Sequence, residues 1–387
     1  MQNFTYFNPV RIEFGEGCIQ KIGKDAAQYG KKALLVYGQG SVVRNGILKQ
    51  VTDSLDAAGV EYVVFSGVKA NPVASHTREG IKLAKQEGCD MIVAVGGGSV
   101  IDESKAISAG ACVAHDFWDF YSGKETVKTA LPVLDVLTVA ATGTEMNGGA
   151  VITNEETKEK LGIVVQPLHP KVSYLDPCVT FTLGKQYTAY AGVDIISHML
   201  EGYLTNDDPY CTIQDGYVEG VMRAVMDAVL TCVENPKDYQ ARAAMMWGST
   251  LAWNGVPLLG LGNYGYPCHM LGHSMSCLYD TAHGASLSVV TPAWMEVMAD
   301  KYQRKLAKFC RNVFREDISC PKEAAQKAAV LFRTWCRKIG APVTLAEIGL
   351  SREDIPSLRE NITFCAPTWG MPEYDEKLVT ELLEHML

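Results

Sequence analysis

The sequence predicts an α/β domain over residues 1–180 followed by an all-α domain over residues 181–387. Three observations predict this organisation. At 387 residues the chain exceeds what one hydrophobic core usually supports. Its first half alternates short apolar runs with amphipathic stretches, which is the pattern of a parallel sheet with crossover helices. From about residue 182 the strand signals fade, and long helical patterns replace them.

The first half contains apolar runs that suit strands covered on both faces. The runs 32–37 and 91–95 are bounded by glycine, and the expected strands are 32–37, 61–65, 91–95 and 136–140. Helical periodicity between them predicts helices near 43–58 and 75–88. The order of these segments is βαβα, so we expect a parallel sheet.

The second half is expected to be helical throughout. Pro170 and the pair Asp176 and Pro177 mark the transition, and we place the domain boundary near residue 180. The expected helices are 186–203, 210–233, 238–254, 286–311 and 321–338.

Composition excludes several classes of protein. The chain has 35 basic and 44 acidic residues, a formal net charge of −9, and no Lys/Arg block, which argues against nucleic acid as a partner. No apolar run of about 18 residues predicts a membrane span, and the first residues do not resemble a signal peptide. The 12 cysteines are scattered, without a C-x-x-C motif, which is typical of reduced thiols in the cytoplasm.

Histidines gather in two segments. Asp194 and His198 are four residues apart, and so are His269 and His273, so each pair lies on one face of a helix. A straight helix from His269 to His283 would cover about 21 Å, so the chain must fold back near residues 280–284 for these side chains to meet. A carboxylate with two or three imidazoles suits Fe(II), Zn(II) or another divalent first-row ion. The alternative is a set of ordinary hydrogen-bonded pairs.

A glycine-rich turn follows the strand that ends at Val95. The residues Gly96, Gly97, Gly98 and Ser99 precede a helix, and glycines at such a turn let a phosphate approach the helix start. This is not the G-x-G-x-x-G fingerprint. The alternative is simple capping, with Ser99 as N-cap and Asp102 as its N3 partner.

Two further features have open interpretations. The turn 138–145 is rich in threonine and could hold a phosphate or a nicotinamide edge, or be an ordinary turn. Lys160 could pair with phosphate or be solvated.

These motifs occur together in the order and spacing of a known family. The glycine turn with Asp102 and Lys105, the turn 138–145, Asp194-x3-His198 and His269-x3-His273-x9-His283 resemble the iron-containing, or group III, alcohol dehydrogenases. The chain is most similar to their NADPH-dependent butanol dehydrogenase branch. The resemblance spans nearly the whole chain, and the histidine pattern is its most specific part, because glycerol dehydrogenases and dehydroquinate synthases share the glycine turn.

The resemblance implies a dinucleotide-binding α/β domain, a helical metal-binding domain and an active site in the cleft between them. The implied metal ligands are Asp194, His198, His269 and His283. His273 would lie near the nicotinamide and relay a proton, or would simply pack one turn after a ligand. The implied cofactor residues are Gly97, Gly98 and Ser99 at the pyrophosphate, and Asn71, Asp102, Thr138, Thr142 and Lys160 around the rest of the nucleotide.

The choice of dinucleotide follows from the turn at 37–41. NAD sites place an acid on the ribose 2′-hydroxyl, and this turn has none. Gly38 leaves room, Ser41 can donate a hydrogen bond and Arg44 can add charge, or be solvated. We therefore expect NADP(H).

The expected activity is reversible hydride transfer between NADP(H) and short to medium-chain primary alcohols and aldehydes in a cytoplasmic homodimer. The family suggests the dimer, through the strand near residues 10–14. Trp253, Tyr264 and Tyr266 suit a short aliphatic or aromatic aldehyde, or are helical core. Alternatives are a glycerol dehydrogenase, a dehydroquinate synthase-like lyase and a non-catalytic scaffold. The lyase would need cations, and segments 191–203 and 257–284 contain no Lys or Arg.

Overall fold

The computed structural model describes all residues, 1–387, and the chain divides into two compact units. The α/β unit is Phe7–Thr182, and the helical unit is Leu183–Leu387 together with Met1–Tyr6. The predicted α/β domain began at residue 1, whereas residues 1–6 belong to the helical unit. The Met1 amine lies 2.9 Å from the Asp208 carboxylate, and the Gln2 N–H donates to the Gly260 carbonyl at 2.8 Å. These contacts hold the segment on the helical unit.

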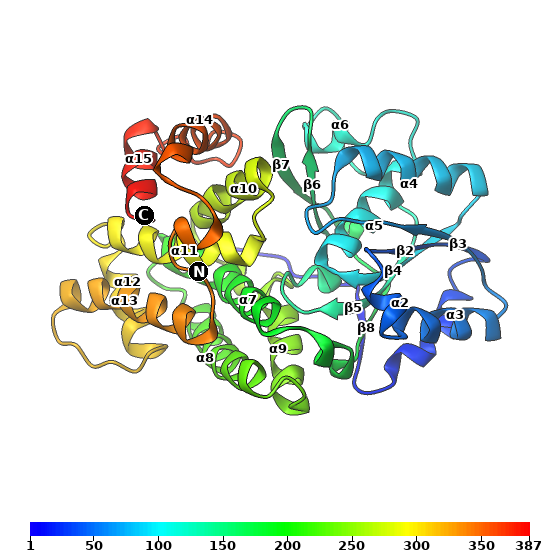
Figure 1. The fold of residues 1–387 in the computed structure, drawn as a ribbon, viewed down its shortest axis with the longest axis horizontal. Coiled ribbons are helices and arrows are strands. Elements are labelled where there is room, and N and C mark those ends of the chain that lie inside the picture. The colour runs from blue at the N-terminus through cyan, green and yellow to red at the C-terminus, as the bar shows by residue number, and fades with distance from the viewer. The chain divides into compact units, whose positions relative to one another are not determined.

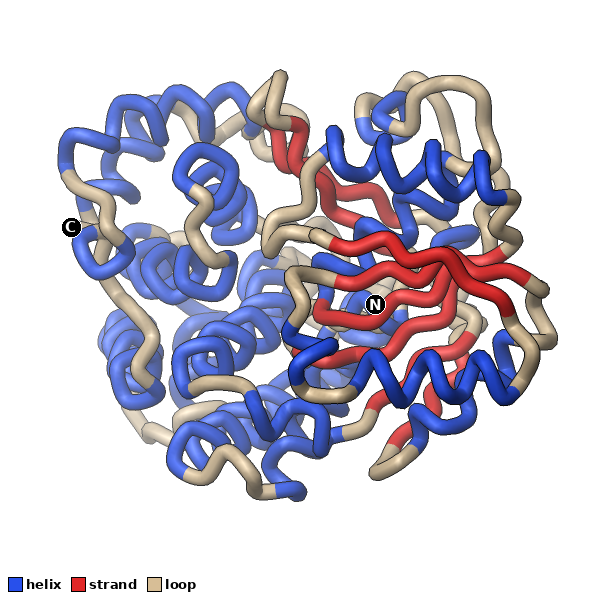
Figure 2. Tube along the Cα trace, turned by 45° about the vertical axis from the view of Figure 1, so that its right-hand side comes forward, coloured by secondary structure: helices blue, strands red, loops and turns tan.

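The α/β unit is built on a six-stranded sheet whose neighbouring strands are all parallel. The strand order is β1-β8-β5-β4-β2-β3, and the strands form one twisted layer in Figure 2. Their bounds are β1 Arg11–Phe14, β2 Lys32–Tyr37, β3 Glu61–Ser66, β4 Met91–Gly97, β5 Val133–Val139 and β8 Val172–Leu175. The predicted parallel sheet is confirmed.

Helices cover both faces of this sheet (Figure 1). The side chains of Leu35 and Val93 pack with Ile19, Ile47 and Leu55 in one fully buried cluster, so the face toward α1 and α3 is apolar. The opposite face meets α4 and α5 (Figure 1). Helix bounds in this unit are α1 Ile22–Ala26, α2 Ser41–Arg44, α3 Ile47–Ala57, α4 Ala74–Glu87, α5 Gly98–Gly110 and α6 Trp118–Tyr121.

A small antiparallel hairpin interrupts the βα alternation. It consists of β6 Gly149–Asn154 and β7 Glu159–Val164, which pair only with each other as strands. Its register sets Thr153 opposite Lys160. These strands were not among those predicted, because the apolar runs of β6 and β7 are short and the turn between them, 155–158, is polar.

The helical unit consists of nine helices. Their bounds are α7 Lys185–Thr205, α8 Thr212–Glu234, α9 Tyr239–Ala252, α10 Pro267–Tyr279, α11 His283–Val297, α12 Gln303–Asn312, α13 Pro321–Ile339, α14 Ile355–Cys365 and α15 Glu376–Glu384. None of the helices in the structure is long and apolar enough to cross a membrane.

The prediction of a single helix over 286–311 is wrong. The chain leaves α11 after Val297 and begins α12 at Gln303. Tyr302 in the connecting turn stacks on Trp294, with ring centroids 5.1 Å apart, so an apolar residue occupies the turn itself. The hydrophobic pattern therefore continues through the turn, and periodicity alone did not reveal the break.

The fold-back expected near residues 280–284 is confirmed. Helix α10 ends at Tyr279, Asp280 adopts the left-handed conformation with φ 53°, and α11 begins at His283. Short polar residues such as aspartate tolerate this region better than most. The reversal packs α11 along α10 and brings its first residue back toward the histidines of α10.

Candidate metal and cofactor sites

Helix α7 carries the first two members of the histidine cluster. Asp194 and His198 are one turn apart and buried, at 4% and 8% exposure. The Asp194 Oδ1 atom lies 3.4 Å from His198 Nδ1. The same His198 Nδ1 is 2.8 Å from the Asp194 backbone carbonyl, which can only accept, so the ring proton belongs on Nδ1 and the lone pair on Nε2.

Helices α10 and α11 bring the other imidazoles to the same carboxylate. His269 Nε2 lies 3.9 Å from Asp194 Oδ1, and His283 Nε2 lies 3.6 Å from it. His269 sits in the first turn of α10, where Pro267 opens the helix, and His283 is the first residue of α11. Three helices of the helical unit thus place one carboxylate oxygen among three imidazoles.

Close packing of α11 on α7 depends on a glycine. A methyl group at Gly284 would overlap the backbone of Tyr190, one turn before Asp194. Only glycine permits this approach, and the approach is what brings His283 to Asp194.

The donor set fits a divalent ion. The ligand atoms of Asp194, His198 and His269 all lie within 4.8 Å of one another. Burial, more than the neighbouring His269, holds the pKa of His198 well below its ordinary value, and the neutral imidazole is the form that binds metal. One carboxylate with imidazole nitrogens suits Fe(II), Zn(II) and related ions.

His273 lies beside this set. It is 7% exposed, and its ring is 5.1 Å from the His283 ring and 4.9 Å from the Trp369 ring, centroid to centroid. It is one turn beyond His269 on α10, with the two rings 6.3 Å apart.

Aromatic side chains flank three of the histidines. Trp253 is 5.1 Å from His198, and Tyr266 is 5.5 Å from His269, between ring centroids. Trp253 and Tyr266 contact each other edge to face at 5.1 Å. These two residues, which the sequence could assign either to the site or to the core, border the histidine cluster. Trp369 had no sequence signal, because it lies in a loop after α14.

Glu201 is the residue that sequence analysis missed at this site. It follows His198 by three residues and Asp194 by seven, so it continues the same face of α7. Its carboxylate contacts His269 Nδ1. Burial raises the pKa of Glu201, and hydrogen bonds from the Cys268 and His269 backbone work in the opposite direction by stabilising the carboxylate. The i, i+4, i+7 spacing was the signal that could have identified it.

The expected cofactor residues belong to the α/β unit. Most follow the carboxyl ends of parallel strands, which share one edge of the sheet and are where ligands of such sheets bind. Gly38 and Ser41 follow β2, and Asn71 follows β3. Gly97, Gly98, Ser99 and Asp102 lie at the junction of β4 and α5. Thr138 lies near the end of β5, Thr142 follows it, and Lys160 lies on β7.

Three turns converge at the start of α5. A methyl group on Gly98 would overlap the Thr142 side chain, and one on Gly38 would come within 3.7 Å of Val100 Cγ2. Ser99 Oγ donates to the Ala70 carbonyl. The turns after β2, β3 and β5 therefore all touch the glycine turn after β4.

The glycine turn is not a capped helix start. The N-cap of α5 is Gly97, no side chain caps it, and Ser99 is the second residue of the helix. Asp102 instead accepts from Thr144 Oγ1 at 2.6 Å and from the Val151 N–H at 3.0 Å. The capping-box alternative is therefore wrong, because Asp102 is directed toward β6 rather than toward the helix start.

The geometry of this turn fits a phosphate. The first N–H groups of α5 have no side-chain acceptor, and they favour an anion. Thr142 Oγ1 is buried beside Gly98 without a hydrogen-bond partner in the protein. A backbone cradle with a hydroxyl at its rim is the arrangement that a pyrophosphate uses.

Lys160 is not solvated. Its ammonium donates to Asn71 Oδ1 at 2.9 Å, and the two residues are 8% and 7% exposed. The contact joins β7 to the loop after β3. Two residues expected at the cofactor, 89 positions apart in the sequence, are thus brought together.

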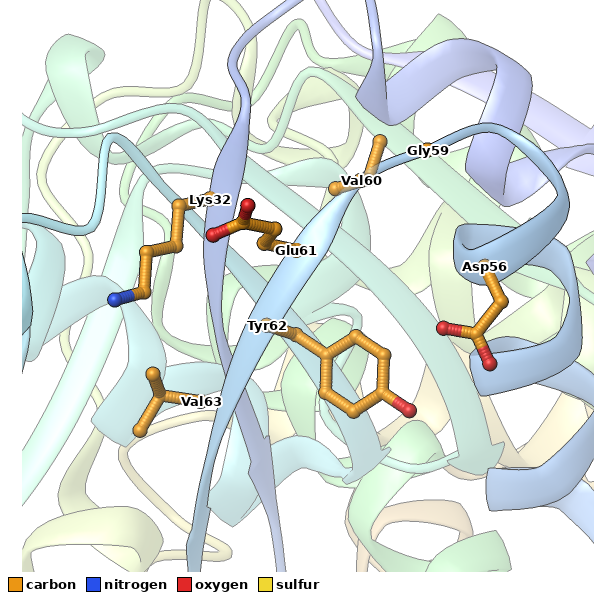
Figure 3. Close-up of a pocket in the computed structure, with 7 residues that line it drawn as sticks. All are labelled: Lys32, Asp56, Gly59, Val60, Glu61, Tyr62 and Val63. Carbon is orange, nitrogen blue, oxygen red and sulfur yellow. The ribbon is translucent and has the colours of Figure 1, made fainter.

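One open depression of the α/β unit lies elsewhere (Figure 3). Lys32 and Glu61 begin β2 and β3 and line it, together with Asp56, so it stands at the amino ends of the strands. In Figure 3 the Tyr62 ring points toward Asp56. None of the expected cofactor residues lines it, and ligands of parallel sheets bind at the opposite edge.

The fold and the two sites define a class of protein. Its α/β unit has a glycine turn that fits a phosphate, and its helical unit has a cluster of one aspartate and three histidines. Comparison with known families agrees. Residues 9–177 match the model of the iron-containing alcohol dehydrogenases, and residues 188–384 match that of the C-terminal part of the Fe-containing alcohol dehydrogenase family. The chain belongs to the iron-containing alcohol dehydrogenase family.

Individual relatives cover almost the entire chain. NADH-dependent butanol dehydrogenase A of Clostridium acetobutylicum is 37% identical over 92% of this chain and 91% of its own. The NADPH-dependent aldehyde reductase YqhD of Escherichia coli is 32% identical over 94% and 93%. The crystal structure of NADH-dependent butanol dehydrogenase A from Thermotoga maritima is 42% identical, covers 100% of this chain and 99% of that chain, and superposes with a TM-score of 0.95.

Proposed function

We propose that this chain is a metal-dependent, NADP(H)-linked alcohol dehydrogenase that interconverts short to medium-chain primary alcohols and aldehydes. The observation that carries the proposal is the convergence of His198, His269 and His283 on Asp194. The relatives support the reaction, because they include butanol dehydrogenases and an aldehyde reductase.

The helical unit would bind the metal and the reacting carbonyl. Asp194, His198, His269 and His283 would hold a divalent ion, Fe(II) in the first place, which when bound polarises a carbonyl oxygen as a Lewis acid. A ring nitrogen of His273 would supply the proton that the product oxygen needs. His273 suits this role because it stands next to His283 but outside the ligand set.

The α/β unit would bind the dinucleotide, whose nicotinamide supplies or accepts the hydride. Gly97, Gly98 and Ser99 would lie at the pyrophosphate, with Thr142 donating to it. Asn71, Asp102, Thr138 and Lys160 would border the rest of the cofactor. The basis is the uncapped start of α5 and the buried Thr142 hydroxyl.

The NADP(H) preference rests on the turn after β2. Residues 37–44 contain no acid, Ser41 opens α2, and both Ser41 and Arg44 are exposed. A 2′-phosphate would therefore meet a hydroxyl and a cation instead of a carboxylate. Several relatives are named for NADH, so this part of the proposal needs a direct measurement.

The test of the cofactor is a kinetic comparison. Metal-loaded protein should reduce butanal with a higher kcat/KM for NADPH than for NADH. Ser41→Asp should lower that ratio by about fivefold or more, since a negative charge placed near the 2′-phosphate at the surface costs about 1 kcal/mol or more. Ser41→Asn is the uncharged control and should change it little. A clear preference of the unmodified protein for NADH would reject this assignment.

The substrate class follows from the residues beside the cluster. Trp253, Tyr266 and Trp369 flank the histidines, and segments 191–203 and 257–284 carry no cation for an anionic substrate. We therefore propose unbranched aliphatic or aromatic aldehydes as substrates. Turnover of a phosphorylated or carboxylated substrate in preference to butanal would contradict this.

The proposal includes the oligomeric state of the protein and its cellular compartment. We propose a homodimer formed through β1, the outer strand of the sheet, where Phe7 and Phe14 are 69% and 42% exposed. Light scattering on the purified protein should give twice the chain mass, and a monomeric mass would contradict it. The 12 cysteines form no disulfide in the structure, which supports a reducing compartment such as the cytoplasm.

A further inference from the structure

One carboxylate connects the two helices that carry most of the proposed metal ligands. Glu201 lies on α7 and is 1% exposed. Its Oε1 atom contacts the ring Nδ1 of His269. Its Oε2 atom accepts from the backbone N–H of Cys268 at 2.5 Å and from that of His269 at 3.3 Å. Both oxygens are thus occupied by the first turn of α10.

The first turn of α10 has no local alternative to this carboxylate. Its N-cap is Tyr266, whose side chain does not cap the helix, and Pro267 follows it. The Cys268 and His269 N–H groups would otherwise be buried donors without an acceptor, which is costly. Glu201 therefore caps α10 from a different helix, and the same contact holds the His269 ring.

Two histidines of this cluster, His198 on α7 and His269 on α10, are oriented in different ways. His198 Nδ1 uses the carbonyl of Asp194, four residues earlier on the same helix, at 2.8 Å. This partner is present whenever α7 forms. His269 has a side chain from another helix as its partner, so its ring orientation depends on one residue.

We propose that Glu201 is a positioning residue for the metal site: it keeps the His269 proton on Nδ1 and directs the Nε2 lone pair toward Asp194. The proposal deepens the proposed function, since it concerns the same metal site. In this arrangement Nε2 faces Asp194 Oδ1 at 3.9 Å, on the side where His283 Nε2 also meets that oxygen. Carboxylate partners of this kind fix the tautomer of a ligand histidine.

The test compares two buried Glu→Gln variants of the helical unit. Glu201→Gln keeps the volume but has only one acceptor for three N–H groups. Glu219→Gln is the matched control, because Glu219 is 6% exposed and accepts from Tyr203 at 2.9 Å and Asn312 at 3.0 Å, away from the histidines. Fe(II) and Zn(II) affinities of the metal-free proteins would be measured by competition with a chromophoric chelator.

We expect Glu201→Gln to weaken metal binding by about 10–100-fold, the usual effect of losing such a partner, and Glu219→Gln to change it by less than about threefold. Glu201→Asp, which keeps the charge but is one methylene shorter, should fall between Glu201→Gln and the unmodified protein. Equal losses for both Gln variants, or no loss for Glu201→Gln, would reduce Glu201 to a structural residue and overturn the proposal.

A second measurement needs no metal. Nitrogen NMR of ring-labelled histidine in the metal-free protein should show His269 protonated at Nδ1, and Glu201→Gln should move part of the population to Nε2. A proton on Nε2 in the unmodified protein would overturn the proposal. If the unmodified protein binds no metal while His269 has the expected tautomer, the metal role in the proposed function fails and the positioning by Glu201 stands.

Discussion

The two candidate sites of this protein are built in opposite ways. The metal site of the helical unit is made of side chains, which α7, α10 and α11 present at helical spacing. The cofactor cradle of the α/β unit is made largely of backbone, exposed where glycines leave out side chains at the ends of parallel strands. Side-chain sites are therefore sensitive to the chemistry of each residue, and backbone sites to the volume of each residue.

The largest effect expected from this comparison is the loss of a ligand. His269→Ala and Asp194→Ala should each lower activity by more than about 100-fold. Loss of a residue that only hydrogen-bonds to a metal ligand already costs up to about 100-fold, and loss of the ligand itself should cost more. Metal content, measured by elemental analysis, should fall with activity. Binding of NADPH, measured by fluorescence, should stay the same, because the cradle lies in the other unit. Retention of full turnover by either variant under chelation would remove the metal from the reaction.

A volume change can also break the side-chain site. Gly284→Ala places a methyl group against the Tyr190 backbone, which cannot move aside as a flexible side chain can. Overpacking of this kind costs about 1–3 kcal/mol, so the thermal midpoint should fall. The shift of α11 should carry His283 away from Asp194 and weaken metal binding.

The control for this variant is Gly216→Ala on α8, where an added methyl group meets no atom within 4 Å. It should be neutral or slightly stabilising, because alanine is the better helix former. Metal affinity in Gly284→Ala equal to that of the control would show that the α7 and α11 contact does not set the site.

The cradle should respond mainly to side-chain volume. Gly98→Ala overlaps the Thr142 side chain and should weaken NADPH binding by about fivefold or more, if an overpacking cost of about 1–3 kcal/mol falls on the cradle. Metal content should not change. Adding Thr142→Ser removes the methyl group that the new side chain would overlap and keeps the hydroxyl proposed to donate to the phosphate, so it should restore part of the affinity. A double variant no better than Gly98→Ala would contradict the steric explanation.

The smallest effect concerns the frame of the α/β unit. Asp25 on α1 accepts from Tyr174 at 2.5 Å and pairs with Arg11. Burial alone would raise its pKa, but the hydrogen bonds from Arg11 and Tyr174 lower it overall below 3.8. The carboxylate therefore stabilises the fold above the unfolded-state pKa, and this contribution is lost as the pH falls through the lower folded-state value.

Asp25→Asn should lower the free energy of unfolding by about 1–3 kcal/mol near neutral pH, measured with denaturant. The difference from the unmodified protein should shrink as the pH falls below 4. Metal and NADPH affinities should not change. A difference independent of pH would show that the carboxylate charge contributes nothing.

The same contrast explains which residues of the site and which strands could be predicted from the sequence. Spacing predicted the pairs Asp194 with His198 and His269 with His273, because helix period turns a four-residue interval into a shared face. It did not reveal Glu201, whose partner is 68 residues away on another helix. The strands 32–37 and 91–95 were predicted because buried parallel strands are continuously apolar. The strand 61–65 has the same kind of apolar run, although β3 is a partly exposed outer strand of the sheet. The hairpin of β6 and β7 has only short apolar runs on either side of a polar turn.

Long-range placement corrected several interpretations. Asp102 had capping of α5 as an alternative role, and its carboxylate instead accepts from Thr144 and from the Val151 N–H. Lys160 had solvation as an alternative, and it is buried against Asn71. Each outcome depends on an element that is distant in the sequence, so no local pattern could decide it.

The sequence by itself determined the two-part organisation, the helical spacing of the ligand pairs and the glycine turn, because each depends on residues within a few positions of one another. Only the tertiary structure decided which atoms meet. The reversal at Asp280 and the Gly284 contact bring His283 to Asp194, and the Glu201 carboxylate sets the ring of His269. These contacts join separate helices, and their geometry is fixed by packing.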